Sequence, residues 1–222
     1  MSSTTAIRTA LSKLILSSQK SFVRLFGILV TGGSRGIGYH LAQLFARDKY
    51  GLILVSRKRT DLEKVANELK SKYQCPQITI IDKDLSKPGS ADELYSEIKT
   101  KHQLKIDFLV NNAGSGVRGK IWETDLKDDL KAIHVNIIAL MTLTKLVLPE
   151  MIQRNSGRIL MLGSSASSQP SPLLANYAAT KAFIANYTDA LIDELRDTQV
   201  RATLLVPGPT DTVVFKSNLF ID

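Results

Sequence analysis

A glycine-rich segment between an apolar run and a helix-length amphipathic stretch constrains this sequence more than any other feature. The apolar run Phe26–Val30 ends at Thr31, and the segment Gly32-Gly33-Ser34-Arg35-Gly36-Ile37-Gly38 leads into the stretch Ile37–Arg47. Glycines at such a turn let the backbone bend tightly and approach a pyrophosphate, whose charge then lies at a helix N-terminus. The spacing is Gly-x3-Gly-x-Gly rather than the general Gly-x-Gly-x-x-Gly, and a plain tight turn is the alternative. Its place between a strand and a helix predicts a phosphate-binding loop formed by Thr31, Gly32, Ser34, Arg35, Gly36, Ile37 and Gly38.

Short apolar runs and amphipathic stretches alternate through the rest of the chain. Strands are expected at Phe26–Val30, Gly51–Val55, Ile78–Ile81, Ile106–Val110, Arg158–Leu162 and Val200–Val206. Helices are expected at Ile37–Arg47, Leu62–Leu69, Ala91–Lys99, Leu126–Met151 and Leu174–Leu195. Strands separated by helices form parallel sheets through βαβ crossovers. We therefore predict an α/β fold, a Rossmann-type doubly wound parallel sheet in three αβα layers, over residues 26–222.

Composition indicates a globular chain and argues against several classes of ligand and site. Hydrophobic residues make up 44% and charged residues 23%, which is typical of a globular chain. Beyond residue 25 most basic residues alternate with acids on helical stretches, so the net charge of +8 does not indicate nucleic-acid binding. Cys75 is the only cysteine and the three histidines show no ligand spacing, so neither a disulfide nor a metal site is expected. No apolar run reaches the ~20 residues of a membrane-spanning helix, so no transmembrane segment is expected.

Residues 1–25 form a separate N-terminal extension. They contain nine Ser or Thr, four basic residues and no acid, with apolar residues on one helical face and basic residues on another. This pattern is typical of an organellar transit peptide, with a disordered or surface-helical extension as the alternative. The prediction is mitochondrial targeting, against a cytoplasmic or membrane-associated location.

The end of the second expected strand indicates which nicotinamide nucleotide the chain prefers. An acid at this position binds a ribose 2′-hydroxyl, whereas arginine suits a 2′-phosphate. The sequence reads Ser56-Arg57-Lys58-Arg59, and Arg35 adds a cation within the glycine-rich loop. A solvated basic turn is the alternative. The forked guanidinium of Arg57 suits a phosphate monoester, so NADP(H) is the predicted cofactor.

Together with further motifs in order, the sequence resembles the short-chain dehydrogenase/reductase family from about Phe26 to Thr212. The motifs are Asp84-Leu85, Asn111-Asn112-Ala113-Gly114, Asn136, Ser164, Tyr177-x3-Lys181 and Pro207-Gly208-x3-Thr212. Within the family it is similar to the carbonyl- and hydroxysteroid-dehydrogenase-like reductases, through Val55-Ser56-Arg57 and Pro207-Gly208-Pro209-Thr210.

The resemblance implies roles for the matched residues. Asp84 would bond the adenine amino group, and Asn111 and Ala113 would line the cofactor cleft and brace the sheet. Thr212 would contact the nicotinamide carboxamide or the phosphates. The remaining implied cofactor contacts are Leu85, Gly114, Tyr177, Lys181, Pro207, Gly208 and Thr210. The resemblance also implies a homodimer or homotetramer.

Four residues are predicted to carry the chemistry. Tyr177 and Lys181, four residues apart on a helix, share one face, and a neighbouring ammonium lowers the pKa of a phenol toward neutrality. Tyr177 could then protonate a carbonyl oxygen as a nicotinamide delivers hydride. Ser164, with Ser165 as the alternative, would bond the same oxygen. By the resemblance, Asn136 would hold a water that links Lys181 to solvent.

The expected function is NADP(H)-dependent hydride transfer between nicotinamide and a ketone or secondary alcohol of lipid-like or xenobiotic type. The alternatives are a 3-oxoacyl reductase of fatty-acid metabolism and a non-catalytic nucleotide-binding protein. Family members usually continue past the Pro-Gly-x3-Thr segment, so we expect either a fragment or a chain without the substrate-covering segment and the last parallel strand. The apolar residues at the expected substrate side, Val117, Ile121, Trp122, Leu173 and Leu174, favour an apolar substrate.

Overall fold

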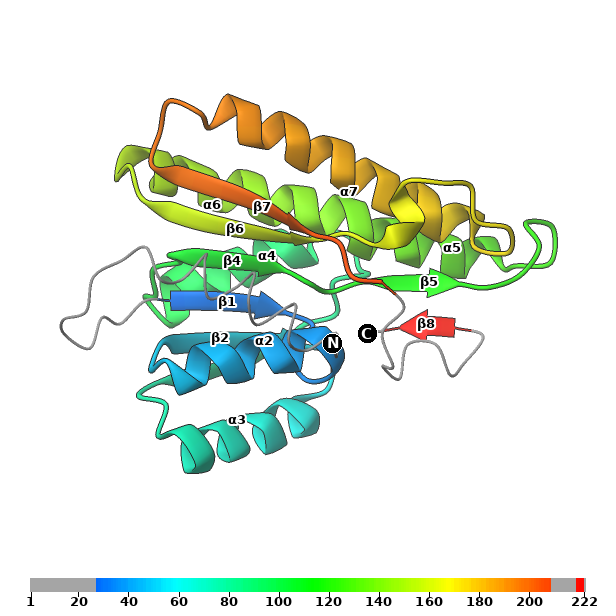
Figure 1. The fold of residues 1–222 in the computed structure, drawn as a ribbon. Helices are drawn as coiled ribbons and strands as arrows, with labels where there is room; N and C mark the ends of the chain where they lie inside the picture. The colour runs from blue at the N-terminus through cyan, green and yellow to red at the C-terminus, as the bar shows by residue number, and fades with distance from the viewer. Residues whose placement is uncertain (1–26, 209–218, 222) are drawn as a thin grey trace.

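A six-stranded parallel sheet forms the centre of the fold (Figure 1). The computed structural model describes residues 27–208 and 219–221. The strands are β1 (Gly27–Thr31), β2 (Gly51–Ser56), β3 (Ile78–Asp82), β4 (Phe108–Asn111), β6 (Gly157–Leu162) and β7 (Val200–Leu205). Their order is β3-β2-β1-β4-β6-β7, which reverses direction between β1 and β4. The predicted parallel sheet is confirmed, and this reversal is the point where doubly wound folds bind their ligands.

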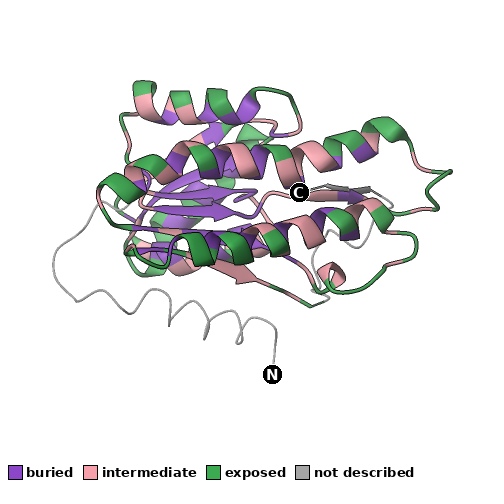
Figure 2. Cartoon of the chain, turned by 90° about the horizontal axis from the view of Figure 1, so that it is seen from above, coloured by how far each residue is buried: buried purple, intermediate pink, exposed green. Residues whose placement is uncertain are grey.

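Helices cover both faces of the sheet and complete the three predicted layers (Figure 1). On one face lie α2 (Gly36–Arg47) and α3 (Arg59–Tyr73). On the other lie α4 (Ser90–Ser96), α6 (Leu140–Gln153) and α7 (Ala175–Glu194). The central strands are therefore buried from both sides, which explains why Leu52–Val55 in β2 is apolar without alternation. Figure 2 shows the buried residues on the strands and on the sheet-facing sides of the helices.

The long helix expected at Leu126–Met151 is continuous but not uniform. It consists of α5 (Leu126–Ile133), the π-helical turn η2 (His134–Ala139) and α6. Length and a mean hydropathy of 1.6 would let Leu126–Gln153 cross a membrane, and no other helix in the described part of the chain qualifies. In this fold its apolar face packs on the sheet, with Leu143 and Val147 in the main core. A second π-helical turn, η1 (Glu97–Lys101), follows α4.

Two short strands were not predicted. β5 (Ser115–Val117) pairs antiparallel with β8 (Leu219–Ile221), apart from the main sheet. A 3-10 turn, η3 (Ser165–Ser167), follows β6. The predicted extension, residues 1–25, and the predicted cofactor contacts Thr210 and Thr212 lie outside the described residues.

Candidate active site

The glycine-rich loop connects β1 to α2 and depends on close backbone packing. Gly32 has a φ of +66°, a conformation that disfavours residues with a side chain. A Cβ on Gly38 would lie 2.3 Å from the carbonyl oxygen of Gly32 and 2.4 Å from Nδ2 of Asn112. Arg35, in extended conformation, precedes the first residue of α2, Gly36. The amide groups of the first turn of α2 therefore face the loop, as an anion-binding helix N-terminus requires.

Thr31 and Asn112 fix this loop to the end of β4. The Asn112 amide nitrogen donates to the carbonyl oxygens of Thr31 (2.9 Å) and Gly32 (3.2 Å). The Thr31 hydroxyl donates to the carbonyl of Val110 and accepts from the backbone nitrogens of Asn112 and Ala113. Sequence reasoning gave Asn112 no role of its own, and the only signal was its place in the Asn111–Gly114 motif. These bonds hold the loop at the point where the strand order reverses.

A cleft with a cavity of about 150 Å³ opens beside this loop. Its lining brings together the predicted residues Gly32, Arg57, Asp84, Leu85 and Ala113. Burial raises the pKa of Asp84, but hydrogen bonds from Ser86 and the charge of Arg57 outweigh it, so the pKa lies below the ordinary value. The Asp84 carboxylate is therefore ionised near neutrality and can accept an amino-group hydrogen bond.

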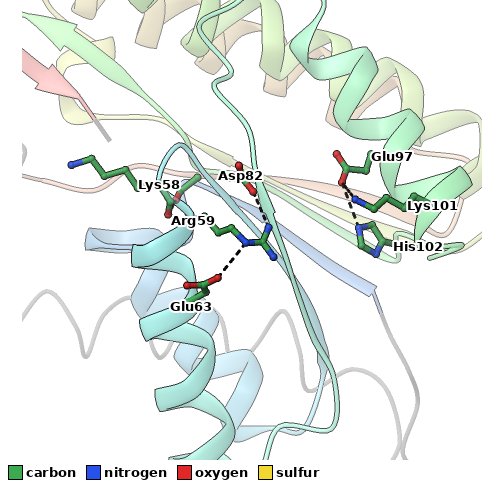
Figure 3. Close-up of polar contacts among 8 residues, drawn as sticks. Lys58, Arg59, Glu63, Asp82, Glu97, Lys101 and His102 are labelled. Atoms are coloured by element: carbon green, nitrogen blue, oxygen red, sulfur yellow. Dashed lines mark hydrogen bonds and ion pairs between the residues drawn. The ribbon is translucent and has the colours of Figure 1, made fainter.

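Within the basic turn after β2, the structure distinguishes Arg57 from Arg59. Arg59 is bound to Glu63 (3.2 Å) and Asp82 (3.0 Å), as Figure 3 shows, and its guanidinium lowers the pKa of Asp82. Lys58 points away from this ion pair in the same view. Arg57 lines the cleft instead. Arg57 is thus the cation of this turn that lines the cleft.

Two of the three histidines, His40 and His102, contact polar side chains near the surface. His102 lies 3.6 Å from the carboxylate of Glu97, which also binds Lys101 (Figure 3). His40 bonds Gln43 on the surface of α2. Within residues 27–208 and 219–221, no group of three or more His, Cys, Asp or Glu could hold a metal ion.

Tyr177 and Lys181 share one face of α7, as their spacing predicts. The ring of Tyr177 lies against Gly116 of β5, where an added Cβ would come within 2.7 Å of ring atom Cδ2. Lys181 is 3% exposed, and its Nζ donates to the carbonyl oxygen of Leu162 at 2.8 Å. The same Nζ lies 5.7 Å from the centroid of the Tyr177 ring. A buried ammonium therefore lies beside the ring of Tyr177.

Asn136 comes to this place from the π-helical turn η2. Its side chain is fully buried, and its Oδ1 accepts from the backbone nitrogen of Ser115 at 2.8 Å. Its Nδ2 donates to the Ser115 carbonyl (2.8 Å) and to the hydroxyl of Thr180 (2.9 Å). A Cβ on Gly114 would lie 3.3 Å from Asn136 Oδ1 and 3.6 Å from Lys181 Nζ. Asn136 Oδ1 and Lys181 Nζ therefore both lie beside Gly114, where its Cβ would be.

Ser164 follows β6 and begins the turn η3, which packs against α7. Its Oγ accepts from the backbone nitrogen of Ala166 at 3.2 Å, so its hydroxyl proton is not used in that bond. Ser165, the alternative, has an exposed side chain. The backbone nitrogen of Ser165 donates to the carbonyl of Pro207 at 3.1 Å, which brings Pro207 and Gly208 beside this turn.

Asn111, the last residue of β4, is buried between β4, α6 and β6. Its amide nitrogen donates to the Thr144 hydroxyl at 3.0 Å and contacts the sulfur of Met161. These contacts connect β4 to α6 and β6. Ala113, in contrast, lines the cleft.

Comparison with known sequences places these features in a family. Residues 27–219 match the short chain dehydrogenase family. Very-long-chain 3-oxoacyl-CoA reductase of Rattus norvegicus is 33% identical over 184 residues, 81% of this chain and 57% of the rat protein. The protein of that name from Coccidioides immitis is 36% identical over 181 residues, 80% of this chain and 51% of that protein. The chain thus spans about half the length of the curated relatives it matches.

Solved structures agree with this match. A short-chain dehydrogenase from Sphingobium yanoikuyae in complex with NADPH has a TM-score of 0.81 and 28% identity, over 86% of this chain and 74% of that chain. The alcohol dehydrogenase from the archaeon Thermococcus sibiricus complexed with 5-hydroxy-NADP has a TM-score of 0.76 and 29% identity, over 84% of this chain and 77% of that one. The sheet order, the glycine-rich loop and the matched length lead to one conclusion: the chain belongs to the short-chain dehydrogenase family.

Proposed function

We propose that this protein is an NADP(H)-dependent oxidoreductase that interconverts a ketone and a secondary alcohol. One observation carries the proposal: buried Lys181 and Tyr177 lie together on α7, beside the β5 segment that also borders the nucleotide cleft. A lysine and a tyrosine four residues apart on a helix are by themselves a common surface pair. Here they lie at the switch point of a doubly wound sheet, where such folds bind their ligands.

The residues around the cleft fit a dinucleotide. The first turn of α2 and the closely packed Gly32 and Gly38 suit a pyrophosphate. Asp84 and Leu85 suit the adenine end, and Arg57 suits a 2′-phosphate. NADPH and NADP complexes of structural neighbours support this choice of cofactor. When bound, the nicotinamide supplies or accepts the hydride.

Side chains of the protein transfer the proton. In the reducing direction, the Tyr177 hydroxyl donates its proton to the carbonyl oxygen, where negative charge develops. The ammonium of Lys181 stabilises the phenolate that remains. The Ser164 hydroxyl donates a hydrogen bond to the same oxygen. Asn136 fixes the Ser115 peptide beside them.

The substrate is proposed to be a lipid-like or xenobiotic ketone. Ile121, Trp122 and Leu173 are exposed large apolar residues on the loops next to β5 and α7, which favours an apolar substrate. A 3-oxoacyl thioester is the second candidate, because the relatives from rat and Coccidioides immitis carry the name 3-oxoacyl-CoA reductase. Both candidates share a carbonyl carbon that accepts hydride.

Turnover by Tyr177→Phe tests the proposal. The substitution removes one hydroxyl, so NADPH binding should persist while the reduction rate falls by the ~10²–10⁴-fold of a general acid. The assay follows NADPH oxidation with a panel of ketones, steroids and 3-oxoacyl thioesters. Tyr187→Phe, on the same helix and stacked on Phe183, is the control and should keep the wild-type rate.

Two results would contradict this reading. If Tyr177→Phe keeps more than about a tenth of wild-type turnover, Tyr177 is not the proton donor. If the wild-type protein binds NADPH tightly but turns over no member of the panel, it is a non-catalytic nucleotide-binding protein instead.

A further inference from the structure

We infer that Thr180 is a positioning residue for Tyr177, acting through Asn136 and the Ser115 peptide. The inference rests on the proposed function, because it concerns how the proton donor is held. Thr180 lies between Tyr177 and Lys181 on α7 and is 2% exposed. Its hydroxyl bonds Tyr177 within α7 and Asn136 of η2, and Asn136 in turn bonds Ser115 of β5.

The hydroxyl of Thr180 makes two buried hydrogen bonds with opposite roles. It donates to the Tyr177 carbonyl oxygen one turn earlier, at 2.7 Å. It accepts from Nδ2 of Asn136 at 2.9 Å. A hydroxyl has one proton, and the bond to Tyr177 uses it. Thr180 can therefore meet Asn136 only as an acceptor.

This acceptor helps to fix the orientation of the Asn136 carboxamide. Both protons on Nδ2 are used, one by Thr180 and one by the Ser115 carbonyl, while Oδ1 accepts from the Ser115 nitrogen. A flipped amide would place Oδ1 against two acceptor oxygens and Nδ2 against a donor. Because Asn136 is fully buried, no exposed surface would relieve that mismatch.

The Ser115 peptide carries this constraint to Tyr177. Ser115 precedes Gly116, and the Tyr177 ring lies so close to Gly116 that a Cβ there would come within 2.7 Å of the ring. The surface that supports the phenol is thus held by Asn136, and Asn136 is held by Thr180. Loss of the Thr180 hydroxyl should let this surface move without removing any group that touches the substrate.

Hydrogen exchange tests the structural step without any turnover. In Thr180→Val the shape is kept and the acceptor is lost, so the Ser115 amide should exchange at least about tenfold faster by NMR than in the wild type. Thr180→Ser restores the hydroxyl and should restore protection. Thr188→Val is the matched control, because Thr188 is equally buried on α7 and its hydroxyl donates only to the Ile184 carbonyl within the helix.

Steady-state kinetics test the positioning step. Misplacing the proton donor affects the reacting geometry more than binding, so Thr180→Val should lower kcat about tenfold or more and leave KM within about twofold. Thr180→Ser should recover most of kcat. Thr188→Val should keep kcat even if its melting temperature falls as much as that of Thr180→Val.

The two readouts separate this inference from the proposed function. Unchanged Ser115 exchange in Thr180→Val overturns the inference, as does equal loss of kcat in Thr180→Val and Thr188→Val. If the wild-type protein reduces no substrate, the proposed function fails. The exchange result then decides whether Thr180 holds the Ser115 peptide.

Discussion

Replacing Arg57 by aspartate should weaken the binding of NADPH relative to that of NADH. Arg57 lines the cleft, and its charge helps to lower the pKa of Asp84, so the two side chains share one electrostatic environment. Its neighbour Arg59 cannot replace it without breaking its bonds to Glu63 and Asp82. The substitution removes the cation and places a second carboxylate beside Asp84.

The size of the effect follows from the bond that is lost. A hydrogen bond from a guanidinium to a phosphate contributes ~1.5–3 kcal/mol, which corresponds to about a 10- to 150-fold weaker Kd for NADPH. NADH has no 2′-phosphate to repel, and an aspartate can accept from its ribose 2′-hydroxyl. Its affinity should therefore stay constant or rise.

Nucleotide fluorescence titration at constant ionic strength measures both affinities. Lys58→Asp is the matched control, because it reverses a charge at the adjacent residue, whose side chain points away from the Arg59 ion pair. A general electrostatic effect would weaken NADPH binding equally in both variants and would decrease with salt. The reasoning is refuted if the wild type binds NADH as tightly as NADPH, or if Arg57→Asp leaves their ratio unchanged.

Other consequences can be measured on the same protein. Gly38→Ala should destabilise the fold by about 1–3 kcal/mol in thermal unfolding, because its Cβ would overlap Gly32 and Asn112; an unchanged melting temperature would show that the loop can relax. The pKa of Asp84 is lower in the folded state than its value of ~3.9 in the unfolded chain, so the ionised carboxylate stabilises the fold at pH values above that unfolded pKa. This stabilisation is lost as the pH falls through the folded pKa. Ser86→Ala should therefore cost about 1 kcal/mol or less at neutral pH, and a denaturation series should show the difference from wild type vanishing in acid. Residues 1–25 fused to a fluorescent protein should direct it to mitochondria, and a diffuse cytosolic signal would exclude that role.

The main elements of the fold could be predicted from local pattern because the central strands β1, β2, β4 and β6 are buried on both faces. Leu52–Val55 is apolar throughout, and the helices between strands carry one apolar side. β5 and β8 could not be predicted in this way. Each has three residues, too few to show a period, and their pairing joins segments about a hundred residues apart.

In the candidate site, too, only contacts within one helix could be predicted from the sequence. Spacing brought Tyr177 and Lys181 together, since residues four apart on a helix share a face. The bonds of Asn112 to the glycine-rich loop, and of Thr180 to Asn136, depend on how three elements meet in space. No local pattern encodes such contacts, and asparagine and threonine occur in many other settings.

The π-helical turn η2 sets the rotational phase between the two halves of the long helix. One residue of an α-helix corresponds to a rotation of about 100° around the axis. The half that precedes the turn lies next to the site, and the half that follows carries Leu143 and Val147 into the core. A one-residue deletion within His134–Ala139 would therefore turn either Asn136 away from Ser115 or Leu143 away from the sheet. A change of length here cannot be absorbed as in a surface loop, because it would disturb either the contacts of the site or the packing of the core.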